Sequence, residues 1–282
     1  MIKTLVKPLI STNDNIDLEV LIFKTKFSDV KILEKPMIDW VKDCVLNYKT
    51  TIQNFNEKKN ELEQIKMFKP KSRFLLVLYS FNPLLTKNNI DLCVDYLVLK
   101  GEKMVKLPFG YIFETEYLKT LTQIKEPLMF SADGSEFLKI ESEQEVGYAA
   151  EVLQRRIITN FINMGVKFIN PQNIVINAYV KLQKGAVIYP FNTLSGNTIV
   201  CEGATLKEGN TIINSEIGKN AVVANSVIKD STICSNCIVF PFNTIENNTF
   251  VGANSTIKSY NKINNSYIGE NSTIESFNDI GK

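Results

Sequence analysis

Residues 176–206 read INAYVKLQKGAVIYPFNTLSGNTIVCEGATL, and this stretch decides the fold. An aliphatic residue stands at every sixth position, and the series continues to Ile280 with only four steps of five residues. Helices repeat every 3.6 residues and ordinary strands every two, so neither explains this period. A six-residue period is typical of a parallel β-helix, in which short strands wind around a triangular prism. The series comprises Ile176, Leu182, Ile188, Leu194, Val200, Leu206, Ile212, Ile217, Val223, Ile228, Ile233, Val239, Ile245, Val251, Ile257, Ile263, Ile268, Ile274 and Ile280.

Each hexapeptide supplies one face of the prism and points its aliphatic side chain inward. At three faces per coil, the series predicts about six coils. We expect a small residue four places after the aliphatic one to fill the tight interior near the corner. Asn and Gly crowd the corners, because they tolerate the turn conformation there. The expected small inward residues are Ala186, Thr198, Ala204, Ala221, Thr232, Cys237, Thr249, Ser255 and Ser272.

The sequence before the repeat has a mixed α/β pattern. Residues 18–23 read as a strand, and the apolar run 74–79 fits a central parallel strand. An amphipathic helix is predicted over residues 36–47, and residues 54–66 read as an exposed helix or insertion. A further helix is expected over residues 86–99, capped by its first residue, a threonine.

A second long helix pattern precedes the repeat. Ser142 and Glu145 resemble a capping box at its start, and Gly165 is well placed to end it. The predicted organisation is therefore an α/β domain over residues 1–141, a connecting helix over 142–165 and the β-helix over 166–282.

Composition excludes several classes of function. The 282 residues include 32 basic and 30 acidic side chains, a net charge of +2, which gives no electrostatic case for nucleic acid or a membrane surface. No apolar run is long enough to span a membrane, and the N-terminus lacks the pattern of a signal peptide. Five cysteines without framework spacing indicate a reducing compartment, so we expect a cytoplasmic protein.

The chain has no histidine, which removes the commonest general base and metal ligand. Catalysis would have to use carboxylates, Lys, Tyr, Cys or a metal held by oxygen. Cys234 and Cys237 look like half a zinc site, but no second pair accompanies them. Cys237 occupies an inward position of the repeat, so we predict a core role for it and no metal site.

The linker and the first coils carry specific motifs. They include EVLQRRI at 151–157, NPQN at 170–173, VIYP at 187–190 and LSGNT at 194–198. With these motifs the chain resembles the bifunctional N-acetylglucosamine-1-phosphate uridylyltransferase/glucosamine-1-phosphate acetyltransferase family. The resemblance is close over residues 143–282 and weak before them. It implies a shortened nucleotidyltransferase-like domain, a connecting helix and a left-handed β-helix that forms a homotrimer.

The N-terminal part departs from that family at its phosphate and metal sites. The family's Gly-rich loop is replaced by residues 21–28, LIFKTKFS, which contain no glycine. The family's Tyr-Gly-Asp, whose carboxylate binds Mg²⁺, is replaced by residues 79–81, Tyr-Ser-Phe. Because α/β ligand sites gather where strands end, Tyr79, Ser80 and Asn82 are the candidate ligand-binding residues.

The acetyltransferase half departs as well. On a gapless match, the family's phosphate-binding arginine falls on Glu246 and its lysine on Asn264. Its general-base histidine falls on Ser276 and its tyrosine on Asp279. Losing a positioned general base typically costs about 10²–10⁴-fold in rate, and an acid in place of an arginine repels a phosphate.

Two functions follow as hypotheses. The first is a catalytically degenerate homologue, or pseudoenzyme, that acts as a trimeric scaffold, partner subunit or ligand sensor in sugar-nucleotide and cell-envelope metabolism. Such a protein would bind a sugar nucleotide, for example UDP-N-acetylglucosamine, or a protein partner. The alternative is a nucleotidyl- or acyltransferase on an amino-sugar phosphate with a rebuilt site, and only this alternative requires Mg²⁺ or acetyl-CoA.

Overall fold

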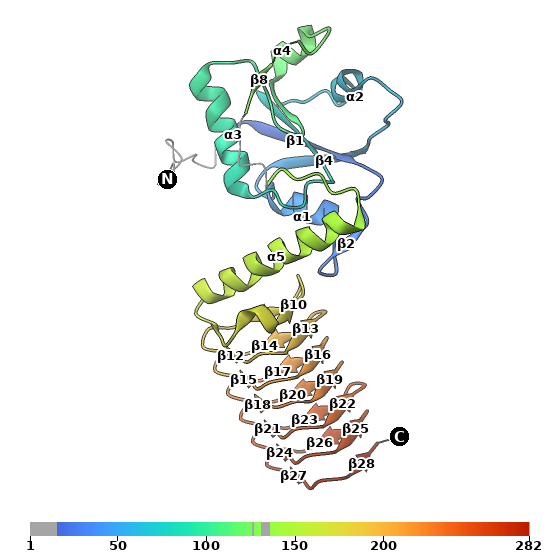
Figure 1. Ribbon diagram of the computed structural model, residues 1–282, viewed down its shortest axis with the longest axis vertical. Coiled ribbons are helices and arrows are strands. Elements are labelled where there is room, and N and C mark those ends of the chain that lie inside the picture. Colours follow the sequence, from blue (N-terminus) through green and yellow to red (C-terminus); the bar gives the residue numbers. More distant parts are fainter. Residues whose placement is uncertain (1–15, 126, 131–135, 282) are drawn as a thin grey trace. The chain divides into compact units, whose positions relative to one another are not determined.

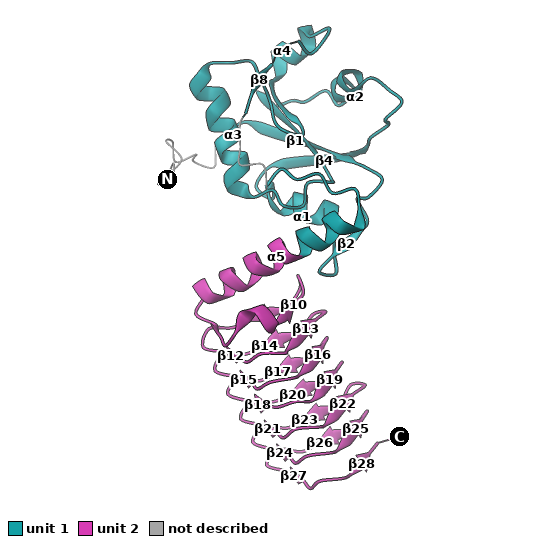
Figure 2. Ribbon diagram, in the orientation of Figure 1, with its two compact units in different colours: residues 1–150 teal, residues 151–282 magenta. Residues whose placement is uncertain are grey.

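The structure, a computed structural model, describes residues 16–125, 127–130 and 136–281 (Figure 1). The chain divides into two compact units, unit 1 at residues 1–150 and unit 2 at residues 151–282 (Figure 2). The division falls inside helix α5 (Glu143–Asn163), the predicted connecting helix. The predicted capping box is present at the start of α5, because the Glu145 carboxylate accepts from the Ser142 backbone N–H and the Ser142 hydroxyl accepts from Glu145 N–H.

Unit 1 is built on one mixed sheet, which has six strands among the described residues. Three neighbouring strands run parallel at one side of the sheet, and the last of them pairs with the fourth strand in the antiparallel sense. The residues 31–36 form a small separate hairpin of β2 (Lys31–Ile32) and β3 (Lys35–Pro36). In spatial order the sheet strands are β4 (Lys49–Asn54), β1 (Leu18–Lys24), β5 (Phe74–Tyr79), β7 (Tyr111–Glu114), β6 (Met104–Lys106) and β8 (Leu128–Met129).

Helices cover both faces of this sheet. The cluster on one face includes residues of α1 (Met37–Asp43) and α3 (Lys87–Lys100). The cluster on the other face includes residues of α2 (Glu61–Met67) and α4 (Thr115–Thr120). Alternate residues of β1 belong to the two clusters, as the two-residue period of a strand requires.

The strands at 18–23 and 74–79 and the helix with its Thr86 cap are confirmed. The helix predicted over 36–47 ends earlier, at Asp43, and turns follow it. Strand β4 was not predicted, because its polar sequence KTTIQN lies at a sheet edge and buries little. The segment 54–66 is not simply exposed, since α2 buries Leu62 and Ile65 against the sheet.

Unit 2 is a left-handed parallel β-helix with three sheets, as predicted (Figure 1). A short 3₁₀ turn, η1 (Pro171–Asn173), opens the first coil. Sheet one contains β10 (Val175–Ile176), β13 (Thr193–Ser195), β16 (Thr211–Ile213), β19 (Val227–Lys229), β22 (Thr244–Glu246), β25 (Lys262–Asn264) and β28 (Asp279–Ile280). Sheet two contains β11 (Lys181–Leu182), β14 (Ile199–Val200), β17 (Glu216–Ile217), β20 (Thr232–Ile233), β23 (Phe250–Val251) and β26 (Tyr267–Ile268). Sheet three contains β9 (Lys167–Phe168), β12 (Val187–Ile188), β15 (Thr205–Leu206), β18 (Val222–Val223), β21 (Ile238–Val239), β24 (Thr256–Ile257) and β27 (Thr273–Ile274).

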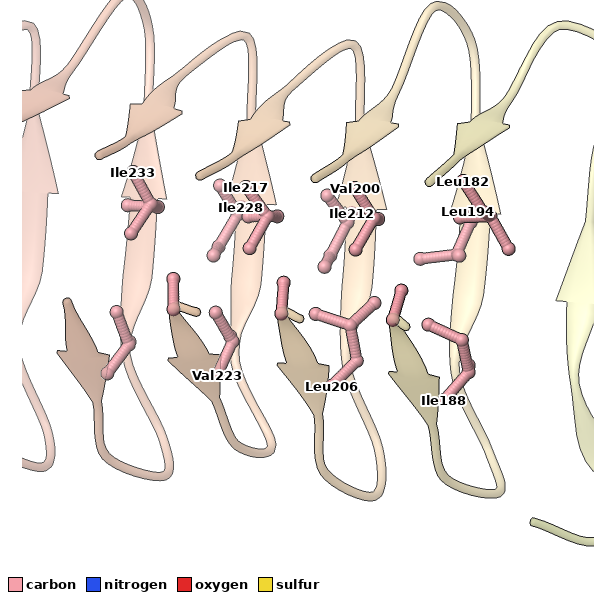
Figure 3. Close-up of a cluster of buried hydrophobic side chains, with 14 of the residues drawn as sticks. Leu182, Ile188, Leu194, Val200, Leu206, Ile212, Ile217, Val223, Ile228 and Ile233 are labelled. Atoms are coloured by element: carbon pink, nitrogen blue, oxygen red, sulfur yellow. The ribbon is translucent and has the colours of Figure 1, made fainter. Parts of the chain in front are cut away.

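The aliphatic series forms the core of the β-helix. Its members point inward from the three sheets and stack along the axis (Figure 3). All are buried through Ile268, whereas Ile274 and Ile280 on the last coil are half-buried. At the other end, Ile158 and Phe161 of α5 belong to the same cluster, so the second half of α5 covers the first coil.

In most coils of sheets two and three, a small inward residue lies two places before the aliphatic residue, whereas sheet one has mainly asparagines at that position, among them the buried Asn192, Asn210, Asn243 and Asn261. For six-residue steps this is the predicted position, and Ala186, Ala204 and Cys237 are buried there. At five-residue steps the position moves, so the prediction for Thr232 is wrong: its side chain is partly exposed and Ser231 is buried instead. Each five-residue corner carries a serine whose hydroxyl donates to the carbonyl two residues back: Ser215, Ser226, Ser231 and Ser266.

The corner between sheets three and one carries aromatic residues where Asn or Gly was expected. Phe242, Tyr260 and Phe277 have φ values of 66°, 65° and 67°, in the left-handed region. Their rings stack with centroids 5.0 Å apart, yet each is more than half exposed. Three such conformations cost about 3–6 kcal/mol, and two ring pairs return about 1–3 kcal/mol. The stacking within this chain therefore does not offset the backbone strain.

Candidate functional site

A cavity of about 860 Å³ opens where β1 and β4 end. The chain crosses from β1 to β4 over the face that holds α1, and from β4 to β5 over the face that holds α2. The first crossover leads from β1 to its neighbour on one side, and the second leads from β4 past β1 to β5 on the other side. The strand order therefore reverses between β1 and β5, which makes this a topological switch point, and the cavity lies next to it at the ends of β1 and β4. Ligands of open α/β sheets bind in the crevice at such a point.

The polar lining of the cavity is rich in lysine. Lys24 forms an ion pair with Asp29 at 2.9 Å. Lys26, Lys58 and Lys59 line the cavity too, and in the described part of the chain none of the three has an ion pair. Their three ammonium groups outnumber the one further carboxylate of the lining, Glu57. The cavity is thus suited to an anionic ligand.

A buried hydroxyl of the cavity wall lacks a partner. Ser28 is 1% exposed, and among the described residues its Oγ finds no hydrogen-bond partner. Its backbone is fixed, because its N–H donates to Thr25 O and its carbonyl accepts from Ile38 N–H. Buried polar atoms are nearly always satisfied, so the unpartnered Ser28 hydroxyl is an exception that calls for an explanation.

Aromatic rings form another part of the cavity wall. Phe23 and Phe55 line the cavity with ring centroids 5.2 Å apart, and Phe55 meets Tyr79 edge-on at 5.4 Å. Tyr79 in turn stacks on Phe81. This cluster fixes the ends of β1 and β5, on which the polar side chains of the cavity depend.

The residues predicted to bind ligand lie behind this wall. Tyr79, Ser80 and Asn82 are buried, and none of them lines the cavity. The Ser80 hydroxyl accepts from Thr25 N–H and bonds the Thr25 hydroxyl, each at 3.0 Å, so it positions a residue that does line the cavity. Asn82 donates to Leu138 O, and its Oδ1 is buried without a partner among the described residues.

Tyr79 also takes part in a buried hydrogen-bond network. Both Tyr79 and Tyr111 donate to the Glu61 carboxylate. Burial first, and then the negative charge of Glu61, raise the pKa of Tyr79 and of Tyr111 far above the ordinary value. The two phenols therefore stay neutral and serve as donors, and they do not act as bases near neutral pH.

The residues that the structure describes do not fit a metal ion. Among the described residues, no three Cys, Asp or Glu side chains come together as a metal would require. Mg²⁺ demands several oxygen ligands, and Asp29 in the cavity is paired with Lys24. Cys237 is buried and donates to Gly252 O, which confirms its predicted core role.

In unit 2 the four residues that the sequence match aligned with the family's site are only partly brought together. Glu246 and Asn264 are register partners on β22 and β25. The Asn264 side chain accepts from Asn247 at 2.8 Å, within a row of corner asparagines. Asp279 is the register partner of Lys262, and Ser276 lies at the corner before β28. Glu246 and Asn264 therefore lie at the C-terminal ends of their strands, whereas Ser276 and Asp279 lie at the N-terminal side of β28.

The lysines of the cavity are the residues that sequence reasoning missed. Lys24 and Lys26 lie in the segment 21–28, which the sequence match aligned with the family's Gly-rich loop, and Lys58 and Lys59 lie in the segment interpreted as an exposed helix or insertion. Two lysine pairs about 30 residues apart were a visible signal, but only the register of β1 on β4 brings them to one cavity.

No family model matches the chain. Among curated proteins it is 34% identical over 150 residues to the bifunctional protein GlmU of Trichormus variabilis, and 33% identical over 150 residues to that of Nostoc sp.. Each match covers 52% of this chain and 33% of the relative. The GlmU of a Cyanothece sp. is 31% identical over 162 residues, or 57% of this chain and 36% of the relative. The predicted resemblance is therefore confirmed over half of the chain, which spans about a third of the length of these relatives.

Two solved acetyltransferases align at 10% identity with most of the chain. The acetyltransferase domain of PglB from Neisseria gonorrhoeae, in complex with acetyl coenzyme A, covers 95% of this chain and 97% of that chain at a TM-score of 0.23. A mutant of perosamine N-acetyltransferase from Caulobacter crescentus, in complex with CoA and GDP-perosamine, covers 93% and 90% at a TM-score of 0.20. Such TM-scores carry no argument about function. None of the described helices has the length and apolar character that a membrane span requires.

Proposed function

We propose that this chain is a non-catalytic, trimeric relative of the uridylyltransferase/acetyltransferase family that binds a sugar nucleotide in the cavity of unit 1. It acts as a sensor or partner subunit in cytoplasmic sugar-nucleotide and cell-envelope metabolism. The observation that carries the proposal is the buried, unpartnered hydroxyl of Ser28 in a cavity wall lined with lysines. A phosphate oxygen can accept from that hydroxyl and from the ammonium groups beside it.

The composition of the cavity supports a ligand of this kind. Lys26, Lys58 and Lys59 supply positive charge for phosphates, and Gln53 and Asn54 supply amide groups for hydroxyls. A lysine binds phosphate as a point charge and needs no glycine-rich backbone. The side chains therefore take the place of the loop that the sequence lacks.

The lack of a catalytic arrangement among the described residues supports the non-catalytic part. The described residues hold no metal-binding group, and the chain has no histidine. Glu246 and Asp279 put negative charge where a sugar phosphate would need attraction. A transferase with a rebuilt site is the alternative, and it predicts turnover with acetyl-CoA or with UTP and Mg²⁺.

A thermal-shift titration of the purified chain tests the binding. UDP-N-acetylglucosamine, UTP with Mg²⁺, glucosamine-1-phosphate and acetyl-CoA are compared as ligands. A ligand at 100 times its Kd adds about 2.7 kcal/mol of stability to the folded state. We expect a clear shift with UDP-N-acetylglucosamine, and no turnover above a protein-free blank with any combination.

Two double variants give the matched comparison. Lys58→Gln with Lys59→Gln removes two charges from the cavity, and we expect at least 10-fold weaker binding. Lys100→Gln with Lys125→Gln removes two exposed charges that do not line it. Equal binding by both double variants, or no shift with any ligand, would refute binding in this cavity. Measurable turnover would favour the transferase.

A further inference from the structure

One corner of the β-helix carries a stripe of exposed aromatic side chains. Phe242, Tyr260 and Phe277 occupy equivalent positions in consecutive coils, so the stripe runs along the β-helix axis. They are 53%, 52% and 79% exposed. We call these three residues, with the neighbouring exposed Ile238 and Phe240 of sheet three, the aromatic stripe.

The backbone at these positions indicates that the rings are retained for an external contact. Asn225 and Gly209 hold the same corner position in the two coils before Phe242, with positive φ values of 35° and 78°, and a further exposed aromatic residue, Phe191, holds it one coil earlier at 61°. Asparagine and glycine adopt that conformation at low cost, and an aromatic residue does not. Because the rings remain largely in water, burial within this chain does not compensate the strain. A partner that covers the stripe would bury the rings and so compensate the strain.

We infer that the aromatic stripe is the surface through which copies of this chain associate, side by side and parallel. This inference rests on the trimeric part of the proposed function and adds the residues that form the contact. A straight stripe along a prism corner can face a common threefold axis, where three identical stripes meet. Closed homo-oligomers are the commonest assemblies of soluble proteins.

The area available fits association between copies. At roughly 200 Å² for a whole aromatic side chain, Phe240 and the three corner rings leave about 450 Å² of apolar surface in water. Two such surfaces in contact remove about 900 Å², and the polar rim brings this to the roughly 1,000 Å² that a specific interface needs.

The charges beside the stripe favour an identical partner over a charged one. Lys258 forms an ion pair with Glu275 at 2.6 Å, and Lys262 is the register partner of Asp279. These four charges cancel, so a nucleic acid or an acidic peptide gains no attraction here. Contact between two copies of this neutral, apolar stripe brings no excess of like charges together.

The test compares association states by sedimentation velocity over a range of concentrations. The triple variant F242N, Y260N and F277N introduces the residue that the chain itself uses at Asn225, so its fold should be kept. We expect the wild type to form trimers at micromolar concentration, and the triple variant to need at least 10-fold more protein to do so. Phe277→Asn alone, at the most exposed ring, should weaken association at least 3-fold and guards against misfolding of the triple variant.

Tyr267→Asn is the matched control. Tyr267 is 74% exposed and stacks on Phe250, but it lies on sheet two, away from the stripe. This variant should associate like the wild type. If the triple variant assembles normally, or if Tyr267→Asn dissociates equally, the stripe is not the interface even though the chain is trimeric. A monomeric wild type overturns both the surface and the proposed trimer, and binding of that monomer to phosphatidylcholine vesicles would assign the stripe to a membrane. Ligand binding in unit 1 is read separately and does not depend on these outcomes.

Discussion

At the residue scale, buried amides hold the corners of the β-helix together. Asn210 is fully buried and donates to Lys207 O at 2.7 Å and to Asn192 Oδ1 at 2.9 Å. Its own Oδ1 accepts from Ser226 N–H at 3.0 Å in the next coil. One side chain thus satisfies backbone groups in its own coil and the next, which a small apolar residue could not do.

The substitution Asn210→Ala should lower the free energy of unfolding by about 2–4 kcal/mol, because it leaves Ser226 N–H and Asn192 Oδ1 buried without partners. Urea unfolding measures the loss. Asn197→Ala, at an exposed side chain of the preceding coil, should change stability by less than about 0.5 kcal/mol. Equal losses at the two positions would contradict the role given to the buried amide.

Glu19 offers a second test at this scale, through pH. Burial acts to raise its pKa, but the ion pair with Lys49 and the N–H groups of Lys71 and Ser72 outweigh burial, so the pKa lies below its ordinary value. A carboxylate with a lowered pKa stabilises the fold above its unfolded-state pKa of about 4.3, and that contribution is lost as pH falls through the folded-state pKa.

Glu19→Gln should therefore cost about 1–3 kcal/mol at pH 7, and the cost should shrink steadily as the pH falls from 5 to 3. Denaturant unfolding at a series of pH values checks this. The exposed Glu116, paired with Lys119, provides the control variant Glu116→Gln, which should cost little at any pH. A penalty for Glu19→Gln that stays constant with pH would be inconsistent with the charged network.

At the scale of the element, the β-helix depends on stacking between coils. Each strand has two or three residues and cannot persist alone, so each inward aliphatic side chain is stabilised mainly by its counterparts in the coils on either side. A residue in the middle of the stack has neighbours on both sides, whereas one on the last coil has them on one side only. The cost of truncation should follow this difference.

Ile228→Ala, in the middle of the stack, should cost about 2–5 kcal/mol, because the coils cannot collapse around the cavity that it leaves. Ile280→Ala, at a half-buried position on the last coil, should cost less than half as much. Chemical denaturation of the two variants provides the comparison, and equal losses would argue against coil-by-coil stacking.

Elements also differ in how well the sequence predicts them. The two buried strands of unit 1 and the capped helix α3 have strong local signals and were predicted correctly. Strand β4 was missed, because its alternation is carried by Thr and Gln and its pairing with β1 supplies what its own residues do not. The aromatic stripe had a local signal, an aromatic residue three places before Ile245, Ile263 and Ile280, but the spacing alone does not say that the rings stay exposed.

At the scale of the whole molecule, the chain consists of two compact units with separate cores. The clusters of unit 1 lie on the two faces of its sheet, and the cluster of unit 2 runs through the β-helix. Among the residues that the structure describes, each of these clusters is drawn from one unit only. Residues that pack in the same core unfold together, so each unit should unfold as its own cooperative block.

Calorimetry should accordingly resolve two transitions. Val77→Ala, in buried strand β5, should lower the temperature of one transition, and Ile228→Ala should lower that of the other. A single transition displaced equally by both variants would mean that the units unfold together. UDP-N-acetylglucosamine should raise only the transition that Val77→Ala lowers.

The sequence by itself determined the β-helix. Its inward residues recur at a fixed spacing, and each coil repeats the environment of the previous one, so a local count is sufficient to predict the core. Only the tertiary structure decided which residues line the cavity, because Lys26 and Lys58 approach each other through the pairing of β1 with β4. It also decided that Ser28 is left without a partner and that Phe242, Tyr260 and Phe277 remain in water. Burial and hydrogen bonding of this kind depend on contacts between distant segments, and no local pattern encodes them.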